Sequence, residues 1–147
     1  MRVSVIGGST VTDEQYQQAR RVGALLGERG HQLVCGGRSG VMEAACAGAS
    51  DVGGHTIGIL PGERREAANE HVDTAIATGM GNARNVLVVL NGDAVIAVNG
   101  TTGTLSELGH ALDVQRPVAG IATWDLEGIE AVSTPEAAVD YVESATL

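Results

Sequence analysis

The sequence predicts an α/β fold in which a mainly parallel sheet lies between two layers of helices. Short runs of Val, Ile, Leu and Ala alternate along the chain with segments of helical periodicity. Such runs suit strands that are buried on both faces of a parallel sheet. Aromatic residues are scarce, with no Phe, one Trp and two Tyr, so aliphatic side chains must form the core. The 147 residues fit one Rossmann-like three-layer domain spanning residues 1–147.

The expected strands share an apolar character and end at small or polar residues. Their predicted ranges are 2–6, 32–35, 55–60, 72–78, 94–98 and 117–122. Loops of small residues follow three of them, at 7–9, 36–40 and 99–104. Because the carboxyl ends of parallel strands lie at one edge of a sheet, these loops are expected to meet where ligands bind in such folds.

The expected helices are recognised by their capping residues and apolar stripes. Their predicted ranges are 13–29, 41–51, 82–90, 105–114 and 135–145. Thr12 followed by Gln15 is a capping-box pattern, and Thr134 before Pro135 is typical of a helix start. Asn82 is expected to cap the helix that follows it.

The charge of the chain restricts its partners. Nine Arg, no Lys and 18 acidic residues give a net charge of −9, which disfavours nucleic acid and anionic membranes as partners. The first apolar run is too short for a signal peptide, and no segment reaches the ~18 apolar residues of a membrane span. We therefore expect a cytoplasmic protein. The acidic composition predicts adaptation to high salt, with an ordinary acidic bacterial protein as the alternative.

The cysteines and histidines do not indicate a metal site. Cys35 and Cys46 are too few for a disulfide framework and lack metal-ligand spacing. Each is expected to be a small buried hydrophobe. The four histidines lack metal-ligand spacing as well, so no metal is expected.

The most informative segment is the small-residue loop at 99–104, with Glu107 one turn further along. An apolar run enters this loop and a helical pattern leaves it. Free N–H groups and the dipole at a helix start favour an anion, and Gly and Thr leave room for one. No loop has the G-x-G-x-x-G fingerprint or a phosphate-binding Lys, which argues against a dinucleotide oxidoreductase or a P-loop nucleotidase. The loop predicts a site for a phosphorylated ligand.

Three motifs occur in an order and spacing that resemble a known superfamily. They are Gly36–Ala45, Gly79–Asn85 and Gly100–Glu107. The chain resembles the Lonely Guy phosphoribohydrolases, and within that superfamily it is most similar to the molybdenum-cofactor carrier branch and its uncharacterised prokaryotic relatives. The resemblance extends from about residue 2 to residue 122.

The resemblance implies a function for two side chains. Lonely Guy enzymes cut the N-glycosidic bond of nucleoside 5′-monophosphates, and Arg84 and Glu107 match their functional Arg and Glu. If this chain is an enzyme, these two would be its catalytic residues. Glu107 would then stabilise an oxocarbenium-like transition state or orient water, and Arg84 would hold the phosphate or the carboxylate.

The chain also departs from the pattern of the enzymes at several positions. Asn99 replaces a Pro, Thr101 a Gly, Asn85 a Lys and Gly81 a His, and Ser106 stands where many of the enzymes have an additional Glu. These changes preserve the anion-binding loop but alter the residues around the carboxylate. They favour a carrier or binding protein over a nucleosidase.

The leading hypothesis is that the chain binds a phosphorylated, nucleotide-like ligand, as a molybdenum cofactor carrier or storage protein. The alternative is a nucleoside 5′-monophosphate phosphoribohydrolase, and a third class, a DNA-processing relative, is disfavoured by the charge. No resident cofactor is required; the ligand is expected to be the molybdenum cofactor or a nucleoside monophosphate. The resemblance also implies a homo-oligomer, a dimer or a tetramer. The candidate ligand-binding residues are Gly8, Ser9, Gly37, Arg38, Ser39, Gly40, Met42, Arg84, Gly100, Thr101, Thr102, Gly103, Thr104 and Glu107.

Several of these residues also fit purely structural roles. Glu107 can serve as a first-turn acid that stabilises its helix, and Arg38 can brace its own loop through a salt bridge. Met42 can pack in the core. The threonines of the 99–104 loop can bind phosphate or cap the helix.

Overall fold

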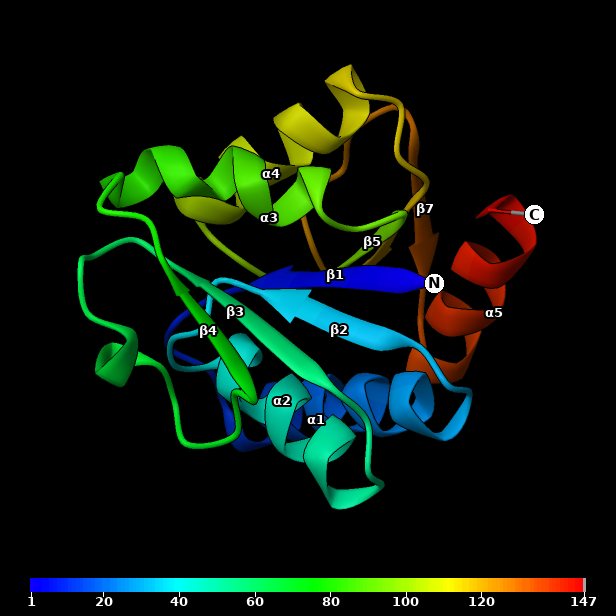
Figure 1. Cartoon of the computed structure of the whole chain (residues 1–147). Helices are drawn as coiled ribbons and strands as arrows, with labels where there is room; N and C mark the ends of the chain where they lie inside the picture. The colour runs from blue at the N-terminus through cyan, green and yellow to red at the C-terminus, as the bar shows by residue number, and fades with distance from the viewer. Residues whose placement is uncertain (147) are drawn as a thin grey trace.

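An entirely parallel seven-stranded sheet forms the centre of the molecule (Figure 1), with the strand order β4-β3-β2-β1-β5-β6-β7. The computed structural model describes residues 1–146. The strands are β1 (Arg2–Gly7), β2 (Gln32–Cys35), β3 (Thr56–Leu60), β4 (Thr74–Ala77), β5 (Ala94–Val98), β6 (Val118–Ile121) and β7 (Ile129–Val132).

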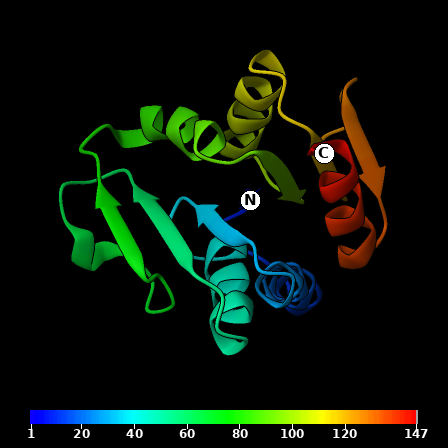
Figure 2. The ribbon, with the colours of Figure 1, turned by 45° about the vertical axis from the view of Figure 1, so that its right-hand side comes forward.

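Helices cover both faces of this sheet (Figure 2). One face carries α1 (Asp13–Glu28), α2 (Val41–Asp51) and α5 (Pro135–Thr146), and the other carries α3 (Asn85–Leu90) and α4 (Thr102–Asp113). Two short 3₁₀ helices, η1 (Arg65–Ala67) and η2 (Gly81–Arg84), lie in the connections. The prediction of a Rossmann-like three-layer α/β fold is confirmed.

Glycines allow α1 and α2 to pack against each other at very short range. A Cβ atom at Gly23 would lie 1.9 Å from the carbonyl oxygen of Ala45, and one at Gly48 would lie 1.9 Å from that of Arg20. Both obstacles are backbone atoms, so no larger residue fits at either position unless the helices move apart. The small residues of these helices are therefore required by packing.

Most predicted elements are confirmed within one or two residues, and the ends of β2 and β5 coincide with the predicted ones. The capping box of α1 is present, since Thr12 Oγ1 accepts a hydrogen bond from the Gln15 N–H (3.2 Å) and Gln15 Oε1 accepts one from the Thr12 N–H (2.9 Å). Thr134 Oγ1 accepts a hydrogen bond from the Ala137 N–H (3.1 Å) at the start of α5.

Three local predictions were wrong. Strand β7 was not predicted, because it lies at the sheet edge and its partly exposed residues form no apolar run. Helix α4 begins at Thr102 rather than Leu105, because Thr and Gly extend its first turn. Asn82 does not cap α3; it lies inside η2, and Arg84 occupies the N-cap position of α3.

The two cysteines lie in the core between the sheet and α2. Cys35 and Cys46 are both buried free thiols with their Sγ atoms 3.5 Å apart, which confirms their prediction as small buried residues. Residues 1–146 contain no group of three or more His, Cys, Asp or Glu arranged to hold a metal ion. In the same part of the chain, no helix combines the length and apolar character needed to cross a membrane.

Candidate functional site

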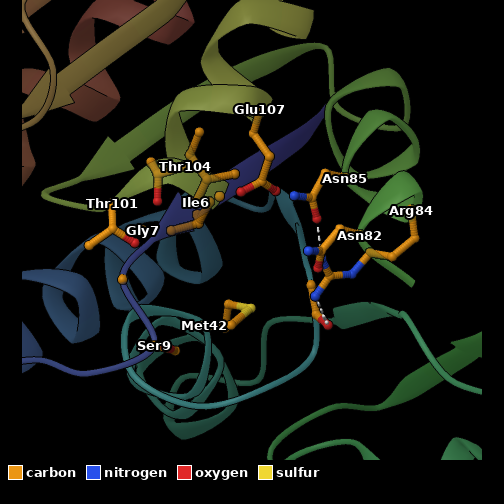
Figure 3. A pocket seen from close by; sticks show the side chains of 14 residues that line it. Ile6, Gly7, Ser9, Met42, Asn82, Arg84, Asn85, Thr101, Thr104 and Glu107 are labelled. Atoms are coloured by element: carbon orange, nitrogen blue, oxygen red, sulfur yellow. Dashed lines mark hydrogen bonds between the residues drawn. The ribbon is translucent and has the colours of Figure 1, made fainter. Parts of the chain in front are cut away.

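The candidate site lies where the strand order reverses, between β1 and β5. The chain leaves β1 toward α1 on one face of the sheet and leaves β5 toward α4 on the other. The two connections therefore diverge and leave a crevice at the carboxyl ends of these strands, the usual ligand site in such sheets. A hollow of about 140 Å³ occupies this position (Figure 3).

The structure brings residues from all three motifs to this hollow. Its lining includes eight of the candidates named from the sequence, and they come from the loops after β1 and β5, from helices α2 and α4, and from η2. They are Gly8, Ser9, Met42, Arg84, Thr101, Gly103, Thr104 and Glu107.

The other six candidates lie outside the lining. Arg38 and Ser39 are exposed, and Ser39 Oγ donates a hydrogen bond to the Ser9 carbonyl oxygen (3.2 Å). Gly40 occupies the N-cap position of α2 with a positive φ of 69°, so close to Gly8 that a Cβ would lie 2.2 Å from the Gly8 oxygen. Ser39 and Gly40 thus hold the loop after β2 against the loop after β1. The remaining three support the loops as well, namely Gly37 against β3, Gly100 against Thr104, and Thr102 at the start of α4.

Six further lining residues were not selected from the sequence. They are Val5, Ile6, Gly7, Gly36, Asn82 and Asn85. Val5, Ile6 and Gly7 form the end of β1, and Gly36 directly follows β2. None of these four residues has a polar side chain to mark it. Asn82 and Asn85 lie in the second motif, close to Arg84 in the sequence. This proximity is the signal that could have identified them.

The start of α4 faces the hollow without a side-chain cap. Thr101 occupies the N-cap position, and its side chain makes no capping hydrogen bond within the described chain. The first-turn N–H groups of a helix have no partner inside the helix itself. Gly103 and Thr104 line the hollow, so this helix end can bind an anion there.

Arg84 is fixed on the opposite side of the hollow from Thr101 in Figure 3. It is only 8% exposed. Its Nε donates to the Ile59 carbonyl oxygen (2.9 Å), an Nη donates to the Gly36 carbonyl oxygen (3.4 Å), and the other Nη contacts Asn85 Oδ1. Burial lowers the pKa of this guanidinium and the nearby Glu107 opposes the change. Arg84 thus keeps a positive charge at a fixed position.

Glu107 projects from α4 toward the hollow, between Thr104 and Asn85 in Figure 3. It is 8% exposed, and no hydrogen bond or ion pair to its carboxylate forms within residues 1–146, so the expected Arg84–Glu107 contact is not an ion pair. Burial raises the pKa of Glu107 to about 7, against the opposing charge of Arg84. A perturbed acid in a cleft is typical of a functional site.

The arrangement combines three groups suited to a phosphorylated ligand. The open start of α4 supplies N–H donors, Arg84 supplies a fixed positive charge, and Glu107 can gain or lose a proton near neutral pH. A protonated Glu107 can donate a hydrogen bond to an oxyanion, whereas the ionised form repels it. The hollow can therefore accept an anion, and its own charge depends on one carboxyl group.

The fold and this site together define a Rossmann-like protein of the Lonely Guy superfamily, as the three motifs predicted. The model of the SLOG cluster4 family matches residues 1–146. The chain belongs to the SLOG cluster4 family.

Two relatives at the sequence level bear on its function. An uncharacterised protein of Archaeoglobus fulgidus is 43% identical over all of this chain and 97% of its own length. The cytokinin riboside 5′-monophosphate phosphoribohydrolase of Mycobacterium tuberculosis is 32% identical over 76% of this chain, and the match spans 64% of that enzyme.

Two solved structures are similar to this one over almost its whole length. The molybdenum cofactor binding protein of Rippkaea orientalis has a TM-score of 0.93 and 37% identity, and the match covers 99% of this chain and 97% of that chain. The molybdenum cofactor carrier protein of Chlamydomonas reinhardtii has a TM-score of 0.87 and 29% identity, with coverage of 97% and 96%.

Proposed function

We propose that the protein binds a small phosphorylated, nucleotide-like ligand in the β1–β5 crevice and serves as a molybdenum cofactor carrier or storage protein. The observation that carries this proposal is the uncapped start of α4 in a hollow that also contains buried Arg84 and Glu107. The structural similarity to molybdenum cofactor binding and carrier proteins supports it. The cofactor would be cargo held by its phosphate, with no metal ligand required from the chain.

The phosphate would lie at the start of α4, against the N–H groups of Gly103 and Thr104. Ser9 and Thr101 line the same end of the hollow and supply hydroxyl donors. Arg84 attracts the anion from the far side, and its own hydrogen bonds to Gly36 and Ile59 keep it there. The start of α4 would therefore contact the phosphate directly, and Arg84 would attract it from a distance.

The test uses ribose 5-phosphate as a probe in titration calorimetry. Arg84→Ala should weaken its binding about tenfold, because it removes the fixed positive charge that attracts the anion across the hollow. Arg84→Lys retains the charge but loses the planar guanidinium whose hydrogen bonds fix its position. Its affinity should therefore lie between those of Arg84→Ala and the unaltered protein. Exposed Arg64 provides the control, since Arg64→Ala should bind as the unaltered protein does. Equal affinity in folded Arg84→Ala would exclude Arg84 from the site.

A phosphoribohydrolase is the second candidate, and Glu107 is the observation that favours it. Its buried carboxylate with a pKa of about 7 matches the functional Glu of the enzymes, and the M. tuberculosis relative is such an enzyme. Release of free base from AMP, abolished in Glu107→Gln, would establish hydrolysis. A carrier would bind nucleoside monophosphates and release no base from any of them.

We also propose a homo-oligomer, a dimer or a tetramer. Strand β4 is an edge strand, and Ile76 on it and Met80 just after it each expose 45% of their surface. Such apolar side chains on an edge suit contact with a second copy. Light scattering after size exclusion should give a multiple of 15.0 kDa, and a monomer would contradict this.

A cytoplasmic location and adaptation to high salt complete the proposal. Acidic residues exceed basic ones, so carboxylates on the folded chain repel one another. Dissolved salt screens this repulsion. The melting temperature should therefore rise between low and molar KCl. A melting temperature that does not rise would argue for an ordinary acidic protein.

A further inference from the structure

A second hollow, of about 270 Å³, opens at the carboxyl ends of β6 and β7. Trp124 and Leu126 give it apolar walls, and Asp125 places a carboxylate in the same lining. Trp124 is the one tryptophan of the chain, and 40% of its surface is exposed. An accessible indole face is a platform on which planar rings stack.

Two hydrogen bonds attach this second hollow to the candidate anion site. Trp124 Nε1 donates to the Thr101 carbonyl oxygen (3.0 Å), and Thr123 Oγ1 donates to the Asn99 carbonyl oxygen (2.7 Å). Thr101 itself lines the first hollow. Thr101, the N-cap residue of α4, therefore connects the indole to the start of this helix. The hydrogen bond from Trp124 fixes the position of the ring relative to the helix start.

The backbone at this junction adopts conformations that L-residues rarely adopt. Asn99, after β5, has a φ of 43°, and Ala122, after β6, has a φ of 48°. Left-handed conformations at non-glycine residues are strained and cluster at ligand sites. The strain lies in the two loops that position Thr101 and Trp124.

The two hollows together have the size of a pocket for one small molecule. Pockets for small molecules measure roughly 300–1,000 Å³. The first hollow, at about 140 Å³, and the second, at about 270 Å³, are each below that range. Together they reach it.

We propose that the hollow beside Trp124 binds the bicyclic heterocycle, a purine or a pterin, of the ligand whose phosphate lies at the start of α4. This inference rests on the proposed function, which supplies the phosphate. The ring stacks on the indole, and the Asp125 carboxylate accepts hydrogen bonds from N–H groups at the ring edge. Trp124 thereby selects ligands that carry a planar ring in addition to a phosphate.

The test compares GMP, which carries such a ring, with ribose 5-phosphate, which lacks it. GMP should bind about tenfold more tightly, the gain expected from one stacked base. GMP should also quench the fluorescence of the single tryptophan, excited at the red edge of its absorption, and ribose 5-phosphate should not. Trp124→Ala should reduce GMP affinity about tenfold and leave ribose 5-phosphate affinity unchanged.

Trp124→Phe separates stacking from bracing, because it keeps an aromatic face and loses the N–H donated to Thr101. Retained preference for GMP in this variant supports stacking. Equal weakening of both probes in Trp124→Ala and Trp124→Phe would show that the indole only braces the loop, and would overturn the inference. Ribose 5-phosphate binding without a preference for GMP would overturn the inference alone. Failure of both probes to bind would overturn the proposed function with it.

Discussion

The two faces of the sheet are packed in opposite ways. Between α1 and α2, Gly23 and Gly48 bring backbones together so closely that an added Cβ would meet a carbonyl oxygen at 1.9 Å. On the other face, α3 and α4 bury the polar side chains of Arg84, Asn85 and Glu107 beside a hollow of about 140 Å³. The first face brings backbones into close contact, and the second contains buried polar side chains next to a hollow. The α1–α2 face therefore contributes tight packing, whereas the α3–α4 face contributes the buried charged groups of the candidate site, at a cost in stability.

The starts of two helices show the same contrast. Helix α1 begins with a full capping box from Thr12 and Gln15. Helix α4 begins at Thr101 without a capping side chain among the described residues. A capped end has its donors satisfied, whereas an uncapped end facing a hollow keeps them for a ligand.

The largest expected effect is on the closely packed face. Gly23→Ala should lower the free energy of unfolding by about 3 kcal/mol, because its Cβ would overlap the Ala45 backbone. Urea denaturation gives the value. Gly109→Ala in α4 is the matched control, since a Cβ there meets nothing within 4 Å, and it should be neutral or stabilising by up to about 1 kcal/mol. Similar losses in both variants would show that the close α1–α2 contact adds nothing to the cost at Gly23.

On the ligand face, Glu107→Gln should stabilise the protein at pH 8 by about 2 kcal/mol. The pKa of Glu107 is raised from 4.5 to about 7 in the folded state, so between these values the folded chain binds more protons than the unfolded one. Stability is then lost as pH rises through this window and does not return above it. Denaturation at pH 5 and pH 8 measures the effect. The advantage of Glu107→Gln should nearly vanish at pH 5, and a constant difference would refute this assignment.

The same carboxyl group should control anion affinity. Sulfate, which does not titrate in this range, should bind more tightly at pH 6 than at pH 8 by up to about tenfold, because protonated Glu107 no longer repels it. Calorimetry at both pH values checks this. Glu107→Gln should bind sulfate equally at both, and a pH dependence that persists in this variant would place its origin elsewhere.

The smallest expected effect concerns the two helix starts. Thr12→Ala should cost about 1 kcal/mol of stability, because it removes a capping hydrogen bond. Thr101→Ala should cost less than about 0.5 kcal/mol without ligand, since no cap is lost. Thermal unfolding of the two variants compares them directly. A larger loss at Thr101 than at Thr12 would contradict the description of α4 as open.

The sequence predicted the buried parts of the fold well. Strands β2 and β5 coincide with their predicted ranges because β5 is an uninterrupted buried apolar run and β2 is a buried apolar run that follows exposed Gln32. Strand β7 was missed because an edge strand needs no such run. Asn82 was misplaced because the 3₁₀ turn before α3 depends on how Arg84 is anchored to Ile59 and Gly36, and these contacts join distant parts of the chain.

The site could be predicted only in part for a similar reason. Arg84 and Glu107 line the hollow with six other sequence candidates, because the motifs that carry them are local. Arg38 points out of the lining, and Val5, Ile6 and Gly36 enter it, because lining a hollow depends on how strand ends and loops are placed in three dimensions. The role of the eight lining candidates as ligand contacts stays a prediction.

The paired thiols between the sheet and the α1–α2 layer have a practical consequence. Cys35 and Cys46 have no exposed surface, so a thiol reagent can reach them only when this layer opens. Their labelling rate would therefore measure how often the contact between the sheet and α2 opens.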